Sequence, residues 1–326
     1  MRYGDQDQES ENVEDRRSEH GGMFGGRGFP GGGGMPFPIP IGGRGGFSIT
    51  TLLIIGALML FFGINPLEIL GGGQGVPNMP QMPRMDPGPG RTATNDRFEI
   101  PGMPRTGAAP QSHDDMAKFV GRVLKDTEDV WNKVFQSFGK QYREPKLVLF
   151  SGATRTACGT GQTAMGPFYC PLDQKVYIDL AFYEELKRRF RAPGDFAQAY
   201  VIAHEVGHHV QTLLGISEKV QNMKQRADDR QANALQVRME LQADCLAGVW
   251  ANLTNQIKGR LEPGDIEEGL NAAAAIGDDM IQRQTQGRVV PEAFTHGSSA
   301  QRVKWFKTGL DTGQMQSCDT FNASNL

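Results

Sequence analysis

The segment that most constrains the fold of this chain is His204-Glu205-Val206-Gly207-His208. Apolar residues recur around it at spacings of three or four, which predicts a helix; they are Phe196, Ala199, Ala203, Val206 and Val210. We expect this helix to be capped by Asp195 and to end near Gly215. Two histidines four positions apart on a helix point the same way, so both can bind one Zn²⁺, and Glu205 can reach a water molecule beside it. The segment therefore predicts a water-activating zinc site; the competing interpretation is two histidines that only pack in a core.

A catalytic zinc site needs a third protein ligand and leaves the fourth position for water. The metzincin pattern would place glycine at 211 and histidine at 214, but the chain has Gln211 and Leu214, so that class is excluded. On a second helical stretch, Glu240 and Asp244 are four residues apart and share a helix face. Glu240 can complete the metal triad, and Asp244 can accept the free ring N–H of a ligand histidine; the alternative is an ordinary solvated acidic face. His209 is expected to pack or cap rather than to bind the metal.

Three segments together resemble one known family: HEVGHH at 204–209, ELQADCLAG at 240–248 and THGSSAQR at 295–302. The chain resembles the bacterial neutral zinc metallopeptidases with one N-terminal membrane segment, which are relatives of the gluzincin peptidases. The resemblance covers residues 113–326 and the apolar run described below. It implies that Glu240 is the third zinc ligand and that Asp244 does not bind the metal but hydrogen-bonds a histidine that does.

The late segment around His296 departs from the pattern of some related membrane gluzincins, which carry His-Pro followed by an arginine. Here Gly297 stands in place of the proline. The resemblance implies that His296 or Arg302 stabilises the oxyanion of the tetrahedral intermediate. A capping histidine and a surface arginine are the alternative interpretation.

Composition excludes some classes of protein and divides the chain unevenly. A net charge of −3 and 38% hydrophobic residues fit neither a nucleic-acid-binding protein nor a wholly disordered chain. Residues 1–46 are rich in glycine and polar side chains and cannot bury a core. We therefore expect a disordered N-terminal segment over 1–46.

An apolar run without a single charge extends from Phe47 to Ile64. It is just long enough to cross a hydrocarbon core of ~30 Å as a helix, so it predicts a transmembrane helix at 47–64. Arg27 and Arg44 precede it and no lysine or arginine follows before Arg84, so the positive-inside rule places the N-terminus in the cytoplasm. Residues 65–112, rich in proline, glycine and methionine, are then a linker to a periplasmic catalytic domain anchored to the bacterial inner membrane.

All four cysteines, Cys158, Cys170, Cys245 and Cys318, follow this apolar run. An oxidising compartment would allow them to pair, and four cysteines allow three connectivities. The short loop between Cys158 and Cys170 favours that pair, which leaves Cys245 for Cys318. A free, buried Cys245 is the main alternative.

Residues 113–326 are numerous enough to bury one sizeable core. A helix capped by Ser112 is expected first, followed by strands at 146–150 and 175–178, with 165–169 as a partner across a turn. Helices dominate the remainder. This order predicts an α+β fold: a mostly helical, zincin-like metallopeptidase domain with a small sheet, preceded by the one transmembrane helix.

The predicted activity is that of a zinc metalloendopeptidase with one Zn²⁺ per chain. Zinc acidifies a water molecule, and Glu205 takes its proton and delivers it to the leaving amine. The expected partners are a peptide or protein substrate and the inner membrane, with no nucleic acid. The alternative is a membrane-tethered zinc-binding scaffold without turnover, which four closed protein ligands rather than three would favour.

Overall fold

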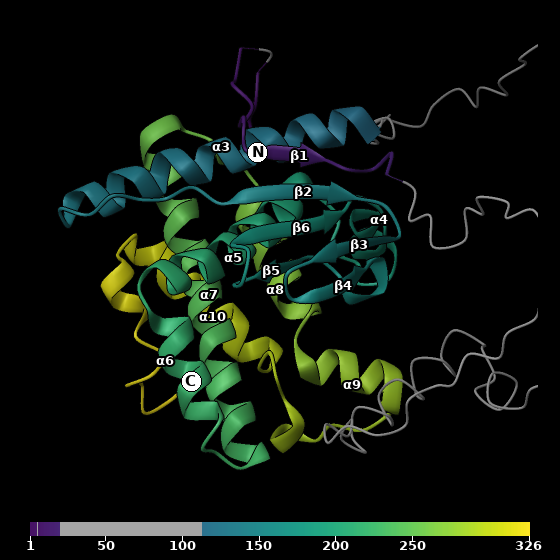
Figure 1. Cartoon of the computed structure of the whole chain (residues 1–326), viewed down its shortest axis with the longest axis vertical. Coiled ribbons are helices and arrows are strands. Elements are labelled where there is room, and N and C mark those ends of the chain that lie inside the picture. Colours follow the sequence, from purple (N-terminus) through teal and green to yellow (C-terminus); the bar gives the residue numbers. More distant parts are fainter. Residues whose placement is uncertain (5, 20–112) are drawn as a thin grey trace, which may run out of the picture. The chain divides into compact units, whose positions relative to one another are not determined.

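The computed structural model describes residues 1–4, 6–19 and 113–326. All of them belong to one compact unit formed by residues 1–25 and 107–326, and a second unit, residues 26–106, lies outside the described residues. Within the described unit a small sheet packs on a larger set of helices, so the α+β, mostly helical part of the fold prediction is confirmed (Figure 1). The domain boundaries predicted at residues 46, 64 and 112 fall outside the described ranges.

Four strands form the main sheet in the order β1-β2-β6-β5. They are β1 Val13–Asp15, β2 Lys146–Phe150, β5 Phe168–Cys170 and β6 Lys175–Asp179. β2 is parallel to both β1 and β6, and β5 is antiparallel to β6. A separate antiparallel hairpin consists of β3 Ala153–Thr156 and β4 Gly159–Gln162. The expected strands at 146–150 and 175–178 are therefore present, and the one expected at 165–169 begins and ends slightly later.

The two faces of the main sheet pack against different layers, because successive strand residues point to opposite sides. One face joins the large core shared with the helices through Leu147, Leu149, Val176 and Ile178. The other face carries a smaller cluster of Val148, Phe150, Cys170 and Tyr177. Phe168 packs on this smaller cluster, and a Cβ atom added to Gly161 of β4 would lie 2.5 Å from its ring. The hairpin therefore packs onto Phe168 at this second face.

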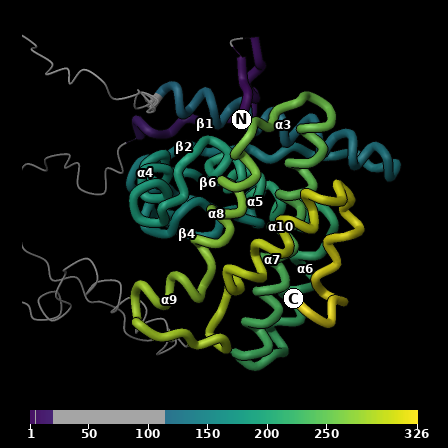
Figure 2. Tube along the Cα trace, turned by 180° about the vertical axis from the view of Figure 1, so that it is seen from behind, coloured from purple at the N-terminus to yellow at the C-terminus, as the bar shows by residue number. Residues whose placement is uncertain are grey.

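The helices supply most of the unit and carry the candidate site. They are α3 His113–Ser137, α4 Ala181–Arg188, α5 Asp195–Leu213, α6 Ile216–Lys224, α7 Asp229–Lys258, α8 Asp265–Ala275, α9 Asp278–Gln286 and α10 Ser299–Thr312. Short 3₁₀ turns are η1 Thr163–Met165, η2 Pro291–Ala293 and η3 Met315–Cys318. In two opposite views α5, α7 and α10 lie side by side (Figure 1 and Figure 2). The predicted cap of the first helix, Ser112, lies outside the described residues.

Glycines let these three helices approach closely. A Cβ atom added to Gly207 of α5 would lie 3.0 Å from the carbonyl oxygen of Ala243 in α7. A Cβ atom added to Gly309 of α10 would lie 1.9 Å from the carbonyl oxygen of Cys245, also in α7. Side chains at these positions would force the backbones apart, so the glycines fix α7 between α5 and α10.

The first 19 residues belong to the folded unit, although we expected disorder over 1–46. β1 is hydrogen-bonded to β2, and the amino group of Met1 lies 2.5 Å from Asp195 Oδ1 at the start of α5. In α3, Asp126 accepts a hydrogen bond from the Tyr3 hydroxyl at 3.0 Å and Glu128 accepts one from the Ser10 hydroxyl at 2.5 Å. Both carboxylates are buried. The expectation of disorder is therefore wrong for residues 1–4 and 6–19, because they supply hydrogen-bond partners that buried charges of α3 require.

The predicted transmembrane helix at 47–64 lies outside the described residues. In the ranges that the structure describes, no helix combines the length and the apolar character needed to span a bilayer. The fold prediction is corrected on this point, and a membrane-spanning helix is not retained in it.

The predicted location also has to be corrected. β1 and β2 are neighbours in one sheet, so the segment around residues 13–15 and the helical domain must lie on the same side of any membrane. A single crossing at 47–64, with a cytoplasmic N-terminus and a periplasmic catalytic domain, would separate these two strands. The predicted inner-membrane topology is therefore wrong.

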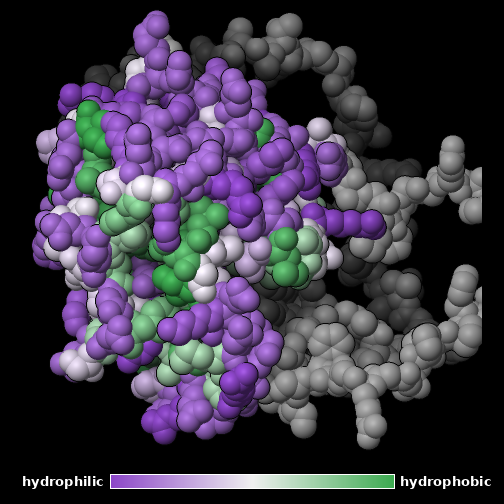
Figure 3. All heavy atoms as spheres, turned by 60° about the vertical axis from the view of Figure 1, so that its left-hand side comes forward, coloured by the Kyte–Doolittle hydropathy of each residue, from purple (hydrophilic) through white to green (hydrophobic). Residues whose placement is uncertain are grey.

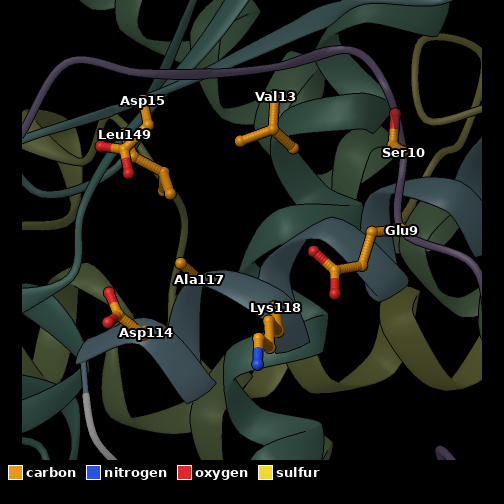
Figure 4. A pocket seen from close by; sticks show the side chains of 8 residues that line it. All are labelled: Glu9, Ser10, Val13, Asp15, Asp114, Ala117, Lys118 and Leu149. Carbon is orange, nitrogen blue, oxygen red and sulfur yellow. The ribbon is translucent and has the colours of Figure 1, made fainter. Parts of the chain in front are cut away.

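The surface is mostly hydrophilic on the face shown in Figure 3, with hydrophobic residues gathered in small groups. Over the whole described surface, the large exposed hydrophobic residues include Met165 and Leu172, which precede and follow β5 in the sequence. A pocket of about 380 Å³ opens between the N-terminal segment and α3, with Val13 and Leu149 facing it (Figure 4). None of its lining residues belongs to α5, α7 or α10. It is therefore distinct from the cluster of histidines and carboxylates described next.

Candidate metal centre

Helix α5 carries the two histidines and Glu205 on a buried stretch of the unit. Its N-cap is Gly194 rather than the predicted Asp195, which forms the first turn. The backbone N–H of Phe196 donates to Glu268 Oε2 of α8 at 3.1 Å. A side chain from another helix thus satisfies an N-terminal donor that we expected a local cap to satisfy.

The ring nitrogens of α5 converge on one carboxylate oxygen of α7. His204 Nε2 lies 3.2 Å and His208 Nε2 lies 3.4 Å from Glu240 Oε2. The three donor atoms all lie within 4.8 Å of one another. A tetrahedral zinc ion with bonds of about 2.0–2.1 Å holds neighbouring donor atoms about 3.3–3.4 Å apart. The donor set of two imidazoles and one carboxylate, at this spacing, fits a zinc ion.

His204 is supported from behind by a fully buried network of charges. Its Nδ1 lies 2.8 Å from Asp244 Oδ1. Arg302 of α10 donates from Nε to Asp244 Oδ2 at 2.9 Å and from Nη2 to Oδ1 at 2.8 Å, and the Tyr200 hydroxyl donates to the same Oδ1 at 2.5 Å. Burial raises the pKa of Asp244, but Arg302 and His204 lower it more, to about 2. Asp244 is therefore a carboxylate at neutral pH, ready to accept the Nδ1 proton of His204.

The other two donors also have partners that hold them in place. His208 Nδ1 lies 2.9 Å from Gln211 Oε1, one turn further along α5. Gln236 Nε2 donates to Glu240 Oε1 at 2.6 Å, which leaves Oε2 toward the histidines. Each donor is thus oriented by one hydrogen bond on the side away from the other donors.

Burial and charge set the proton affinities of the site. Burial raises the pKa of Glu205 above its usual value, and the neighbouring histidines only partly oppose this. Burial lowers the pKa of His204, but Asp244 and Glu240 raise it by more than burial lowers it, so that the pKa is about 10. Without a metal, His204 therefore holds a proton that a metal ion has to displace.

His296 lies in the turn before α10, with its side chain half exposed. Its Nδ1 is 3.2 Å from Asp278 Oδ1, and Asp278 Oδ2 accepts the backbone N–H groups of residues 295–297. Desolvation lowers the pKa of His296, but Asp278 and the negative charge of Glu240 raise it more. The sequence interpretation included a capping histidine with a surface arginine; in the structure Arg302 is instead buried, with 2% of its surface exposed.

His209 packs, as expected, and belongs to none of the described groups that could hold a metal. Its Nε2 donates to the carbonyl oxygen of Arg143 at 2.6 Å, and its Nδ1 lies 3.1 Å from the Tyr169 hydroxyl. Burial lowers the pKa of His209 to about 4. A neutral, doubly hydrogen-bonded imidazole here fixes α5 against β5.

Both favoured disulfides form, so the predicted pairing is confirmed. Cys158 is bonded to Cys170, and Cys245 is bonded to Cys318. The first bond attaches the β3–β4 hairpin to β5. The second attaches η3 to α7 at the residue that follows Asp244.

Sequence reasoning missed four supporting residues: Tyr200, Gln211, Gln236 and Asp278. Three of them lie three or four positions from a site residue on the same helix, a spacing that could have identified them. Asp278 gave no comparable signal, because its partner lies 18 residues away across a loop.

A family model and several known proteins are similar to this chain. A family model described as "Putative neutral zinc metallopeptidase" matches residues 1–321. "Uncharacterized protein YpfJ" of Escherichia coli (strain K12) is 48% identical over 316 residues, which are 97% of each chain. "Uncharacterized protein Rv2575" of Mycobacterium tuberculosis (strain ATCC 25618 / H37Rv) is 44% identical over 232 residues, 68% of this chain and 75% of the relative. No solved structure gives a significant match.

Proposed function

Since the chain belongs to this neutral zinc metallopeptidase family, we propose that it hydrolyses peptide bonds in peptide or protein substrates. One zinc ion would be held by His204, His208 and Glu240. The observation that carries the proposal is the convergence of their three donor atoms. The buried carboxyl group of Glu205 lies on α5, the helix that carries the two histidines. When bound, zinc supplies Lewis acidity, which lowers the pKa of a water molecule and polarises a carbonyl group.

Glu205 is the general base in this proposal. Its pKa is raised by burial, which brings the proton affinity of the carboxylate nearer to neutral pH and suits it to accept a proton and release it again. Glu205 takes a proton from the attacking water and donates it to the leaving amine. The histidines and Glu240 are oriented by their own partners and do not exchange protons in these steps.

Three protein donors favour an enzyme over a zinc-binding scaffold without turnover. A structural zinc usually has four protein ligands, whereas a catalytic one keeps a position open. The described group that could hold a metal here contains two histidines and one carboxylate, and no fourth protein donor is part of it. A zinc ion held by these three residues would keep a position for water, and Glu205 follows His204 on the same helix; a scaffold without turnover would leave both without a role.

The direct test is removal and return of the metal from the purified full chain. Hydrolysis of a casein-like protein is expected to fall to background after treatment with a zinc chelator and to return with one equivalent of Zn²⁺. Mg²⁺ is the control and should not restore it, because Mg²⁺ prefers oxygen ligands in octahedral geometry. Full hydrolysis by a chain from which metal analysis finds no zinc would contradict the proposal.

His296 is proposed to stabilise the oxyanion that forms on the scissile carbonyl. Asp278 holds its Nδ1 side, which leaves Nε2–H free to donate, and the raised pKa favours the protonated ring. We expect His296→Ala to lower kcat by about 10²–10³-fold with little change in KM or zinc content. A variant that raises KM alone would show instead that His296 contributes only to substrate binding.

A further inference from the structure

The two histidines of the candidate metal centre have different supports. His204 has the buried carboxylate of Asp244 behind it, within a network of charges. His208 has the neutral side-chain amide of Gln211, at 2.9 Å from Nδ1. Gln211 is fully buried, so no solvent competes for this hydrogen bond.

The orientation of the Gln211 amide is fixed by its other partners. Its Nε2 donates to the carbonyl oxygen of Met239 at 2.8 Å and to Gln242 Oε1 at 3.0 Å. Because both partners are acceptors, the nitrogen must face α7 and Oε1 must face His208. An amide oxygen only accepts, so His208 Nδ1 carries a proton, and Nε2, 3.4 Å from Glu240 Oε2, is the nitrogen that would bind the metal.

Gln242 extends this chain of hydrogen bonds to the C-terminal turn. Its Nε2 donates to the carbonyl oxygen of Cys318 at 2.9 Å. Cys318 is covalently held to Cys245 of α7, and the Thr320 hydroxyl donates to the carbonyl oxygen of Arg238 at 2.7 Å. One buried path thus connects His208, Gln211, Gln242 and the disulfide-bonded turn.

We propose that Gln211 and Gln242 are positioning residues that set the tautomer and orientation of His208, and that they make zinc affinity depend on the turn held by the Cys245–Cys318 disulfide. The proposal rests on the proposed zinc site but not on turnover. A metal-binding histidine that loses the partner of its second nitrogen loses both orientation and basicity. Gln211 contacts His208 directly, whereas Gln242 acts through Gln211.

Zinc affinity of the full chain is the readout, measured without substrate by competition with a chromophoric chelator. Gln211→Met keeps the length of the side chain and removes the amide, and we expect about 10- to 100-fold weaker zinc binding. Gln242→Met should weaken binding less, because Gln211 retains its bond to Met239. Gln198→Met is the matched control on α5; its side-chain oxygen makes no hydrogen bond in the described structure, so affinity should not change.

Coupling between the substitutions tests the path itself. If Gln242 acts through Gln211, the double variant should bind zinc as weakly as Gln211→Met alone, whereas independent effects would multiply. Replacing both Cys245 and Cys318 by serine should weaken binding in wild-type chain and add nothing to Gln242→Met. Wild-type affinity in Gln211→Met, or multiplying effects in the double variant, would overturn the proposal.

Thermal unfolding of the metal-free variants and zinc binding by the wild-type chain distinguish the possible outcomes. Thermal unfolding reports whether each variant folds. If Gln211→Met does not fold, Gln242→Met is the deciding variant, and an unchanged zinc affinity of Gln242→Met overturns the proposed path. Should the wild-type chain itself bind no zinc, the proposed function fails. If the wild-type chain binds zinc and all the variants bind it equally tightly, only the proposed role of Gln211 and Gln242 fails.

Discussion

Glu205→Gln is expected to reduce peptide hydrolysis by a factor of about 10²–10⁴ and to leave zinc bound at full occupancy. The substitution keeps the size of a side chain that is 93% buried, since only 7% of its surface is exposed. It removes the carboxylate that would accept a proton, but none of the three donor atoms that converge on the candidate metal position. Activity and metal content should therefore separate in this variant, and steady-state kinetics beside metal analysis will measure both.

Glu218→Gln is the matched control for this prediction. It makes the same chemical change at an exposed position of α6, and neither rate nor zinc content should respond. If Glu205→Gln hydrolyses the substrate as fast as the control does, Glu205 is not the general base and the proposed mechanism is wrong. If it instead loses zinc, the carboxylate is part of the metal site and the division of roles is wrong.

The parts of the site that the sequence predicted are those with local spacing. His204 and His208, and Glu240 and Asp244, are pairs four residues apart, and a helix places such pairs on one face whatever the rest of the chain does. What brings the two pairs together is tertiary: Gly207 allows α5 to approach α7 closely. The sequence supplied no measure of that approach, so the family resemblance rather than the spacing joined the two helices.

The first residues show what pattern reasoning could not supply. β1 has three residues, too few for a period-two pattern, and its parallel partner begins at Lys146. The glycines that follow β1 dominate the composition of residues 1–46 and suggested that this whole segment is disordered. Its order comes from long-range contacts, such as Lys175 Nζ donating to Glu14 Oε1 at 2.9 Å. Such pairs between distant charged residues leave no signal in a single sequence.

Arg302→Met is expected to destabilise the metal-free chain by about 3–5 kcal/mol, the usual result of leaving one member of a buried ion pair behind. From the sequence, Asp244 is a carboxylate that supports one histidine, and its removal should therefore change zinc affinity alone. The structure gives Asp244 a second partner, because Arg302 binds both of its oxygens and neither residue is exposed by more than 2%. Removing the guanidinium leaves the buried carboxylate of Asp244 with Tyr200 and with His204, whose single positive charge is shared between Asp244 and Glu240. Denaturant unfolding of chelator-treated protein measures the effect.

The companion variants decide whether the loss comes from the unpaired charge. Lys307→Met on the exposed face of α10 breaks only a solvated ion pair with Asp311 and should cost less than about 1 kcal/mol. Adding Asp244→Asn to Arg302→Met removes the stranded charge, so the double variant should be more stable than Arg302→Met even though it carries one more substitution. Its zinc affinity should nevertheless stay below that of the wild type, because an amide is a weaker acceptor than a carboxylate for the Nδ1 proton of His204. Equal stability of Arg302→Met and Lys307→Met would mean that the charge of Asp244 is not held by Arg302, and the ion pair would then have no part in fixing α10 beside the metal centre.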